Sequence, residues 1–390
     1  MAYKNLDTSI DNMKVNKPIK IALIGGSGDV GGYVSFVDEL IYRLGIESSL
    51  QFAIYKETRS SLSKEDLSSN IRMIRIPRKN KLDLIGNLTK ALNDAIDNEH
   101  VNIIYLLGYV SSPFINKSKI KKNQITLMIN PDGMEWKRRK YGLVEKLYLY
   151  LAEIRAAHIA DYLVVDSKEI GYYFKKKYGR ESIFIPYGYD SKWKIKPFDL
   201  TSVGVRENDY YLVIGRCVPE NNLVEIIKGF SRSQTSKSLL IVTNLDSDNF
   251  SKKLIDLARN DRRIILHGPI YDKDILYYLR ENAFCYIHGH SVGGTNPSLV
   301  EAMGCGNIIL AHKNIYNLEV LGEELGYYFS SPEELQKVIE TIERIDATHL
   351  YIRRSKIKQR ANALYNWEYI VERYRQLFMT AGGEYKHYLL

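Results

Sequence analysis

Short apolar runs of four to seven residues recur along the chain, and a polar or amphipathic stretch follows each of them. Runs of this length, flanked by turn-forming residues, predict buried strands. In the first half of the chain the predicted strands span residues 19–24, 51–55, 71–76, 101–107, 125–129 and 162–166. In the second half they span residues 210–214, 238–242, 264–267, 283–287 and 307–311.

Helical periodicity fills most of the intervals between these strands. Over residues 35–44, for example, Phe36, Leu40 and Leu44 fall on one helical face. Further helices are predicted over residues 141–160, 167–177, 223–230, 250–258, 272–282, 332–345, 349–360 and 367–378. Alternating strands and helices predict mostly parallel sheets with helices on both faces, so the fold class is α/β.

A polar stretch interrupts this alternation and divides the chain of 390 residues, a length that suits two domains. We place a mobile arm at residues 1–17, a first domain at 18–190, a linker at 191–208, a second domain at 209–362 and a final helical segment at 363–390. Ligands of such sheets bind beyond the carboxyl ends of the strands, so a site is expected there.

Positive charge is in excess and unevenly distributed, with a formal net charge of +9. Basic residues gather at residues 117–122, 137–140, 175–177 and 353–360. Such groups usually form solvated faces, but they also suit nucleic acid, anionic lipid or phosphorylated substrates. The first two groups alternate with apolar and aromatic residues, so we expect this face to meet an anionic membrane, with a merely solvated face as the alternative. No nucleic-acid partner is expected.

Neither the N-terminal residues nor the cysteines indicate export or a metal centre. Residues 1–17 lack the apolar core of a signal peptide, and no apolar stretch is long enough to cross a bilayer. Cys217, Cys285 and Cys305 show no metal-ligand spacing. They are expected to be reduced packing residues of a cytoplasmic protein.

The most informative segment is a glycine-rich loop between a predicted strand and a predicted helix, at residues 288–303. Asn296 is the predicted N-cap of the helix and Pro297 its first residue. The junction presents free backbone N–H groups and the positive end of a helix dipole, which suit a diphosphate. Glu301, about one turn into the helix, would reach sugar hydroxyls of the same ligand. The alternative is an ordinary strand–loop–helix connection.

Two histidines, His288 and His290, stand at the end of the strand that precedes this loop. We expect them to face opposite sides of the strand, which argues against their binding one metal ion. His290, next to the glycines, is the better candidate for a ligand contact, and a hydrogen-bonded core or loop histidine is the alternative.

A second glycine motif lies at residues 26–31, where Gly-Ser-Gly-Asp-Val-Gly matches G-x-G-x-x-G between a strand and a helix. In a nicotinamide-dinucleotide enzyme an acidic residue would end the next strand. Only Glu57 is available here, displaced past Lys56. A nucleotide-dependent oxidoreductase is therefore one alternative, and a tight structural turn is another.

Three charged residues follow predicted strands and are candidates for chemistry. Arg216 lies at the mouth of the second sheet, where a guanidinium would hold two phosphate oxygens at once. A surface ion pair with Glu220 is the alternative. Asp132 and Glu135 in the first domain would accept or orient a proton of an acceptor hydroxyl, although Asp132–Gly133 also suits a turn.

Together these segments resemble glycosyltransferase family 4, and more narrowly the bacterial rhamnosyltransferases of cell-wall and capsular polysaccharide synthesis. The similarity spans residues 19–367 and is carried by the loops at 130–138, 184–190, 215–222 and 288–303. Many family members have two glutamates separated by seven residues; Glu301 is the second here, and Gly293 stands in place of the first. Asn221 stands where many have a lysine. Both departures match the rhamnosyltransferase-like subgroup better than the broad family.

The resemblance implies the GT-B fold, in which two Rossmann-like, doubly wound domains face a central cleft and the last helix crosses back to the first domain. It implies transfer of L-rhamnose from dTDP-rhamnose to a lipid-linked or growing glycan acceptor, with retention of configuration. The implied catalytic residues are Asp132, Glu135 and Arg216. The implied donor-binding residues are Gly31, Gly32, Arg216, Asn221, His290, Gly293, Gly294, Thr295, Asn296 and Glu301.

No metal or other cofactor is expected, because Arg216 with helix dipoles would replace a cation. A peripheral position at the inner face of the plasma membrane would suit a lipid-linked acceptor. The alternatives are a transferase that uses another UDP or GDP sugar, a nucleotide-dependent oxidoreductase, and a non-catalytic glycan- or nucleic-acid-binding protein.

Overall fold

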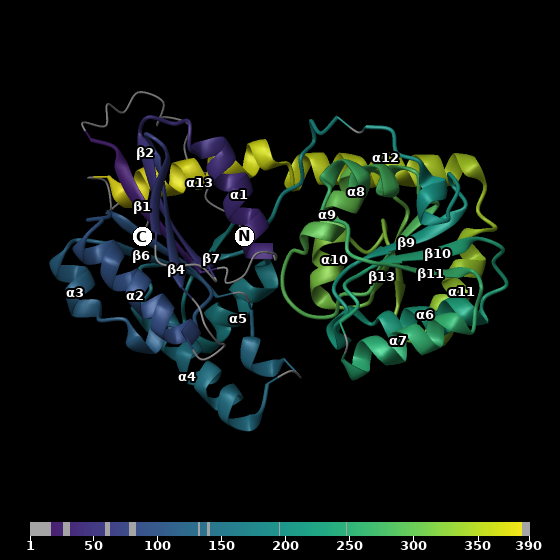
Figure 1. Cartoon of the computed structure of the whole chain (residues 1–390), viewed down its shortest axis with the longest axis horizontal. Coiled ribbons are helices and arrows are strands. Elements are labelled where there is room, and N and C mark those ends of the chain that lie inside the picture. The colour runs from purple at the N-terminus through teal and green to yellow at the C-terminus, as the bar shows by residue number, and fades with distance from the viewer. Residues whose placement is uncertain are drawn as a thin grey trace. The chain divides into compact units, whose positions relative to one another are not determined.

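The chain contains two compact units, each built around its own sheet (Figure 1). The computed structural model describes residues 17–25, 32–58, 63–77, 83–131, 133–138, 141–194, 196–246 and 248–383. The first unit comprises Met1–Pro186 with Glu368–Leu390, and the second comprises Tyr187–Trp367. Residues 1–16 of the predicted mobile arm lie outside the described residues.

The described part of the first unit forms an eight-stranded sheet in the order β3-β4-β2-β1-β5-β6-β7-β8. Its strands are β1 (Ile19–Gly25), β2 (Leu50–Thr58), β3 (Ser63–Ser68), β4 (Ile71–Pro77), β5 (Ile103–Leu107), β6 (Thr126–Asn130), β7 (Tyr162–Val165) and β8 (Ile183–Phe184). All pair in parallel except β3, which runs antiparallel to β4. The apolar-run pattern missed β3 because every one of its residues is exposed.

Helices of the first unit include one from the far end of the chain. They are α1 (Gly32–Leu44), α2 (Asp83–Asp97), α3 (Lys117–Lys122), α4 (Leu143–Ile159), α5 (Lys168–Tyr178) and α13 (Trp367–Gly382), with short 3-10 turns η2 (Ser112–Phe114) and η3 (Glu135–Lys137). The hydroxyl of Tyr374 on α13 lies 3.2 Å from that of Tyr105 on β5, and Thr126 Oγ1 donates to the carbonyl of Ala381 at 2.9 Å. These buried contacts fix α13 against the sheet.

The second unit has a six-stranded parallel sheet in the order β11-β10-β9-β12-β13-β14. Its strands are β9 (Tyr210–Ile214), β10 (Ser238–Val242), β11 (Ile264–His267), β12 (Cys285–His288), β13 (Ile309–His312) and β14 (Tyr327–Phe329). The chain leaves β9 toward β10 on one side and returns to β12 on the other. The carboxyl ends of β9 and β12 therefore flank a topological switch point, where α/β proteins bind ligands.

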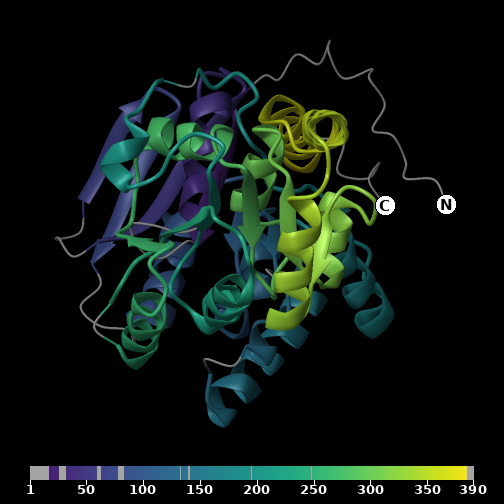
Figure 2. The same ribbon diagram turned by 90° about the vertical axis from the view of Figure 1, so that its right-hand side faces the viewer.

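Helices cover both faces of this second sheet (Figures 1 and 2). They are α6 (Leu223–Arg232), α7 (Asn249–Arg259), α8 (Lys273–Glu281), α9 (Pro297–Gly304), α10 (Ile315–Leu321), α11 (Pro332–Ile342) and α12 (Ala347–Leu364), with 3-10 turns η4 (Leu200–Val203) and η5 (Pro219–Asn221). Side chains of β9 alternate between two buried clusters. Tyr210 and Leu212 join the one that contains α9 and α12, and Tyr211 and Val213 join the one with α6 and α11. The predicted fold class, parallel sheets with helices on both faces, is confirmed.

Candidate functional site

Arg216 lies at the carboxyl end of β9 with its side chain exposed. Its carbonyl accepts hydrogen bonds from Asn221 Nδ2 at 2.8 Å and from the Val218 amide at 2.9 Å, so the backbone of this loop is fixed. The guanidinium forms no hydrogen bond or ion pair with any residue that the structure describes, Glu220 included. The structure therefore does not support the alternative, an ion pair between Arg216 and Glu220.

The glycine-rich loop after β12 is joined directly to this arginine loop. The amide and the hydroxyl of Ser291 both donate to the carbonyl of Glu220, each at 2.9 Å, and Asn222 Nδ2 donates to the carbonyl of Gly289 at 2.8 Å. A Cβ atom on Gly289 would lie 2.1 Å from the carbonyl oxygen of Asn221. Only glycine allows the two loops to approach this closely, so the switch point brings both predicted ligand loops together.

Two of the predicted donor-binding residues contact each other across this junction. His290 Nδ1 lies 2.6 Å from Asn221 Oδ1, and the carbonyl of His290 accepts from Asn314 Nδ2 at 3.0 Å and from Asn317 Nδ2 at 2.9 Å. The sequence interpretation missed Asn314 and Asn317. Asn314 could have been found as an N-cap, because it precedes α10 and its side chain accepts two amides of that helix.

The prediction that His288 and His290 face opposite sides of the strand is wrong. Their ring centroids lie 6.0 Å apart. Residues two apart along a strand share a face, so an alternating spacing places both side chains together. Even so, no group of three or more His, Cys, Asp or Glu side chains within the described ranges is arranged to hold a metal ion.

Burial keeps His288 neutral. Its side chain is 3 % exposed, and its pKa lies well below the ordinary value of 6.5 because of burial first and then the charges that His290 and His312 would carry. Burial lowers the pKa of His312 as well.

The lowered pKa values of His288 and His312 predict that the stability of the protein depends on pH. Near pH 6.5 the histidine of the unfolded chain binds a proton, whereas folded His288 stays neutral. The free energy of unfolding should therefore fall as the pH drops below 6.5, by up to about 1.4 kcal/mol per pH unit. Above pH 6.5 this contribution is complete. Urea midpoints at pH 7.5 and pH 5.5 measure it, and His288→Phe should reduce the difference. Equal midpoints for the wild type at both pH values would contradict the assignment.

The helix start predicted at Asn296 is confirmed. The side chain of Asn296 accepts from the Ser298 amide at 3.0 Å, and Pro297 is the first residue of α9. Gly293 has a φ of +92°, in the left-handed region that favours glycine, and Thr295 is buried. The loop thus leads into a helix N-terminus whose dipole is directed at the switch point.

Glu301 on α9 is paired with a buried arginine that the sequence interpretation missed. Arg280 on α8 is 1 % exposed, and its Nη2 lies 2.5 Å from Glu301 Oε2 and 3.3 Å from Ser298 Oγ. Its Nε and Nη1 have no hydrogen-bond partner among the described residues. The Tyr286 hydroxyl lies 2.6 Å from Ser298 Oγ and donates to the carbonyl of Ile214 at 3.2 Å. A polar network therefore runs from Arg280 and Glu301 to the end of β9.

Of the candidate residues in the first unit, the structure describes Glu135 and Gly32. Glu135, in η3, is ion-paired with Arg138 and accepts from the Tyr141 hydroxyl at 3.2 Å, while its amide donates to the Tyr109 hydroxyl at 2.9 Å. Gly32 is the first residue of α1. Asp132 and Gly31 lie outside the described residues.

The loop that carries Glu135 is anchored by a buried carboxylate. Glu153 on α4 has a fully buried side chain and accepts from Trp136 Nε1 at 2.9 Å and from the Tyr173 and Tyr178 hydroxyls, each at 2.6 Å. Lys177 Nζ lies 2.9 Å from Glu153 Oε1 and 4.3 Å from the Tyr150 ring centroid. Because the carboxylate is well supplied with donors, it holds η3, α4 and α5 together.

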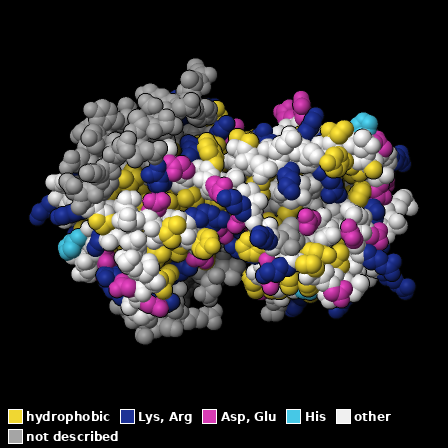
Figure 3. Space-filling model, turned by 90° about the horizontal axis from the view of Figure 1, so that it is seen from above, with side chains coloured by type: hydrophobic (Ala, Val, Ile, Leu, Met, Phe, Trp, Pro, Cys, Tyr) yellow, Lys and Arg dark blue, Asp and Glu magenta, His cyan; other side chains and the backbone are white. Residues whose placement is uncertain are grey.

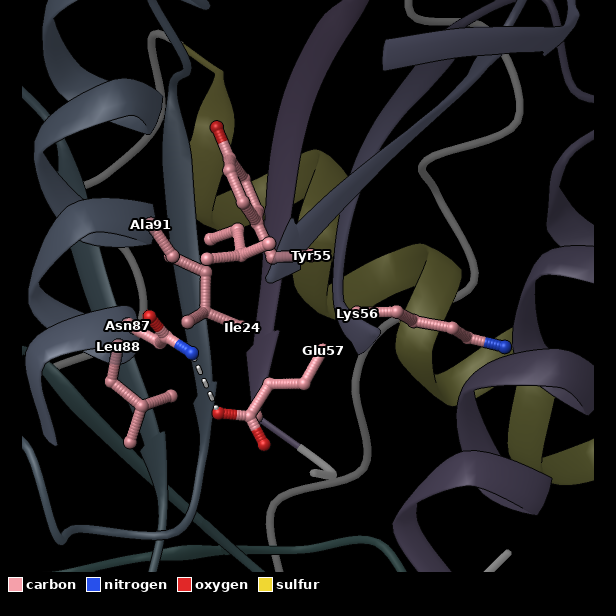
Figure 4. Close-up of a pocket in the computed structure, with 9 residues that line it drawn as sticks. Ile24, Tyr55, Lys56, Glu57, Asn87, Leu88 and Ala91 are labelled. Atoms are coloured by element: carbon pink, nitrogen blue, oxygen red, sulfur yellow. Dashed lines mark hydrogen bonds between the residues drawn. The ribbon is translucent and has the colours of Figure 1, made fainter. Parts of the chain in front are cut away.

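A small pocket lies beside the carboxyl ends of β1 and β2, against α2 (Figure 4). Glu57 lies near the end of β2, and its carboxylate accepts from Asn87 Nδ2 at 3.3 Å. This is the position where a dinucleotide enzyme needs its acidic residue, although the remaining lining is mostly apolar, including Ile24, Leu88 and Ala91. The glycines of residues 26–31 that would complete a dinucleotide site lie outside the described residues.

None of the helices that the structure describes is both long and apolar enough to span a membrane.

Two family models match the chain, one in each unit. Residues 20–190 match a domain of unknown function (DUF1972), and residues 201–363 match Glycosyl transferases group 1. No curated protein matches the chain.

Solved structures share the fold over almost the whole chain. A sucrose-phosphate synthase from Thermosynechococcus elongatus aligns with a TM-score of 0.77 and 18% identity, over 93% of this chain and 100% of its own. Anabaena HepE in complex with UDP and glucose aligns with a TM-score of 0.74 and 16% identity, over 93% and 100%. A glycosyltransferase from Rickettsia africae aligns with a TM-score of 0.72 and 13% identity, over 95% and 100%. The chain thus has the GT-B fold of these structures, and residues 201–363 of its second unit match Glycosyl transferases group 1.

Proposed function

We propose that this protein transfers L-rhamnose from dTDP-rhamnose to a lipid-linked or growing glycan acceptor of a cell-surface polysaccharide. The observation that carries the donor assignment is the unpartnered, exposed Arg216 guanidinium beside the glycine-rich loop at the β9–β12 switch point. A cation, a glycine loop and a helix N-terminus at one sheet edge suit a nucleoside diphosphate. Rhamnose and thymidine rest on the sequence resemblance.

The chemistry follows from charge that develops as the sugar leaves. Breaking the bond between the sugar and the diphosphate leaves a full negative charge on the departing phosphate oxygen. The Arg216 guanidinium and the N-terminal dipole of α9 would stabilise that charge more strongly than the bound substrate, which is what accelerates the step. Glu301 would accept hydrogen bonds from donor hydroxyls, and Asn221 with His290 would line the same edge.

Retention of configuration is the stereochemistry we favour. In an inverting reaction a carboxylate such as Glu135 or Asp132 would have to take the proton of the acceptor hydroxyl. Glu135 is ion-paired with Arg138, so protonation of its carboxylate would break that ion pair. In a retaining reaction the leaving diphosphate takes the proton instead, and Glu135 is left to orient the acceptor.

A UDP sugar is the second candidate donor. HepE, which shares the fold, was solved with UDP and glucose, and a UDP-forming trehalose-phosphate synthase from Burkholderia vietnamiensis also shares it. We propose that neither donor requires a metal ion, since Arg216 and the α9 dipole supply the positive charge. A cytoplasmic position, peripheral at the inner face of the membrane, would bring the enzyme to a lipid-linked acceptor.

A thermal-shift screen with dTDP, UDP, GDP, ADP and NAD tests the donor assignment. A ligand that binds only the folded protein raises the melting temperature by mass action, and at a hundred times its Kd it contributes about 2.7 kcal/mol. We expect the largest shift with dTDP, without added metal and unchanged by EDTA. A larger shift with UDP would transfer the proposal to the second donor. A shift with NAD alone would favour the oxidoreductase instead.

A further inference from the structure

Helix α4 exposes several large aliphatic side chains over its first half, beside the exposed carboxylate of Glu145. Leu149, Ala152 and Ala156 pack inside the unit. On the exposed side, the side chains over the first half of the helix are 54–87% exposed: Leu143 87%, Val144 83%, Leu147 60% and Leu151 54%. Leu143, Leu147 and Leu151 are spaced four residues apart, so they line one side of the helix. Such a stripe of large aliphatic side chains on a soluble face indicates a contact with another apolar phase.

Basic residues flank the start of this stripe in the sequence. The run Lys137-Arg138-Arg139-Lys140 precedes α4 in the sequence, and Lys146 lies on its first turn. Lys137 is exposed, while Arg138 is paired with Glu135. Charges elsewhere are mixed: on the face shown in Figure 3, lysines and arginines are interspersed with aspartates and glutamates. An exposed leucine stripe bordered by basic residues complements the anionic headgroups and acyl chains of a membrane.

The other basic group expected to meet the membrane is arranged differently. In the segment of residues 114–122, Ile115 and Ile120 are buried, 5 % and 1 % exposed, and point away from solvent. Lys117 is paired with Asp161 at 2.6 Å and Lys119 with Asp97 at 2.6 Å. Phe114, at the start of the segment, is 52% exposed. The segment therefore offers one exposed apolar side chain rather than a stripe, and part of its charge is neutralised.

The N-terminal half of α4 is also held rigidly enough to serve as an insertion element. Glu153, on the second half of the helix, receives hydrogen bonds from Trp136 and from two tyrosines of α5. Tyr148 donates to the carbonyl of Val110 at 2.6 Å, and Ser112 donates to the carbonyl of Ala152 at 2.5 Å. These contacts fix the orientation of the leucine stripe, so no ordering of the helix has to accompany binding.

We infer that Leu143, Val144, Leu147 and Leu151 insert into the interfacial layer of an anionic lipid bilayer, with Lys137 and Lys146 against its headgroups. This inference deepens the proposed function, on which it rests for the membrane-bound acceptor. It names α4 of the first unit as the membrane contact, rather than the segment at residues 117–122.

Liposome co-sedimentation of the full-length protein tests the inference. The probes are vesicles of phosphatidylcholine and phosphatidylglycerol in equal parts, and vesicles of phosphatidylcholine alone. The wild type should bind the anionic vesicles. Leu143→Ser with Leu147→Ser should weaken binding by at least about tenfold, because each leucine loses its apolar contact. Lys137→Glu and Lys146→Glu should each weaken it by at least about fivefold, an effect that salt reduces.

Matched controls lie elsewhere on the same unit. Ile46→Ser removes another apolar side chain, 83% exposed, and Lys121→Glu with Lys122→Glu reverses charge in the other basic group. Both should leave vesicle binding within about twofold of the wild type. Binding unaffected by the leucine variant would overturn the inference. So would light scattering that shows a dimer for the wild type and a monomer for the leucine variant, because the occupant would then be a second copy. Vesicle binding and nucleotide shifts are separate readouts, so either proposal can fail without the other.

Discussion

Replacing Glu301 by alanine is expected to lower the free energy of unfolding of the second unit by about 3–5 kcal/mol. Arg280 is 1 % exposed, and the carboxylate of Glu301 is its charged partner at 2.5 Å. Two of its guanidinium nitrogens already lack a hydrogen-bond partner among the described residues. Without Glu301 a buried positive charge would remain without compensation, which costs far more than the loss of an exposed ion pair.

Urea titration followed by hydrogen-exchange mass spectrometry measures this effect for each unit. Peptides from residues 187–367 should lose protection at lower urea in Glu301→Ala, and peptides from the first unit should not change. The double variant Arg280→Met with Glu301→Gln removes both charges and should recover most of the stability. An alanine variant as stable as the wild type would show that water reaches Arg280 and that the pair does not hold the site.

The pair of Arg280 and Glu301 shows which features of this site the sequence does not predict. Asn296 and Pro297 were predictable because N-capping is a local preference that two neighbouring residues satisfy. Arg280 lies in the predicted helix over residues 272–282, where the sequence does not distinguish it from an exposed arginine. Its burial follows from the packing of α8 against α9 around Glu301, a contact between segments about 20 residues apart that no local pattern encodes.

Buried strands were predictable from the sequence because burial requires apolar residues. Exposed strands were not predictable in this way. Central strands such as β5 and β6 are fully buried, so they appear as apolar runs. The edge strand β3 reads Ser-Lys-Glu-Asp-Leu-Ser and is exposed throughout, so hydrophobicity carries no signal for it. The opposite-face prediction for His288 and His290 fails for another reason, because residues two apart along a strand share one face.

Replacing Arg216 by alanine is expected to lower kcat for sugar transfer by about 10²–10³-fold, because a preorganised donor to the departing oxygen is lost. Affinity for the nucleoside diphosphate that gives the largest thermal shift should fall by the equivalent of about 1.5–3 kcal/mol in calorimetry, the value of a hydrogen bond to a charged group. Stability should not change, because the side chain is exposed and has no partner in the described structure.

Two further variants distinguish a direct contact with the diphosphate from a general effect of charge. Arg216→Lys keeps the positive charge but cannot hold two phosphate oxygens in one plane, so it should restore part of the affinity and less of the turnover. Arg206→Ala removes an exposed arginine from the same unit, outside the two loops, and should behave as the wild type. If Arg206→Ala and Arg216→Ala weaken binding equally, and salt abolishes the difference from the wild type, Arg216 contributes only to the general field of the protein. A loss confined to Arg216 and retained at high salt places its guanidinium on the diphosphate, since a close, partly desolvated ion pair is screened much less than a distant one.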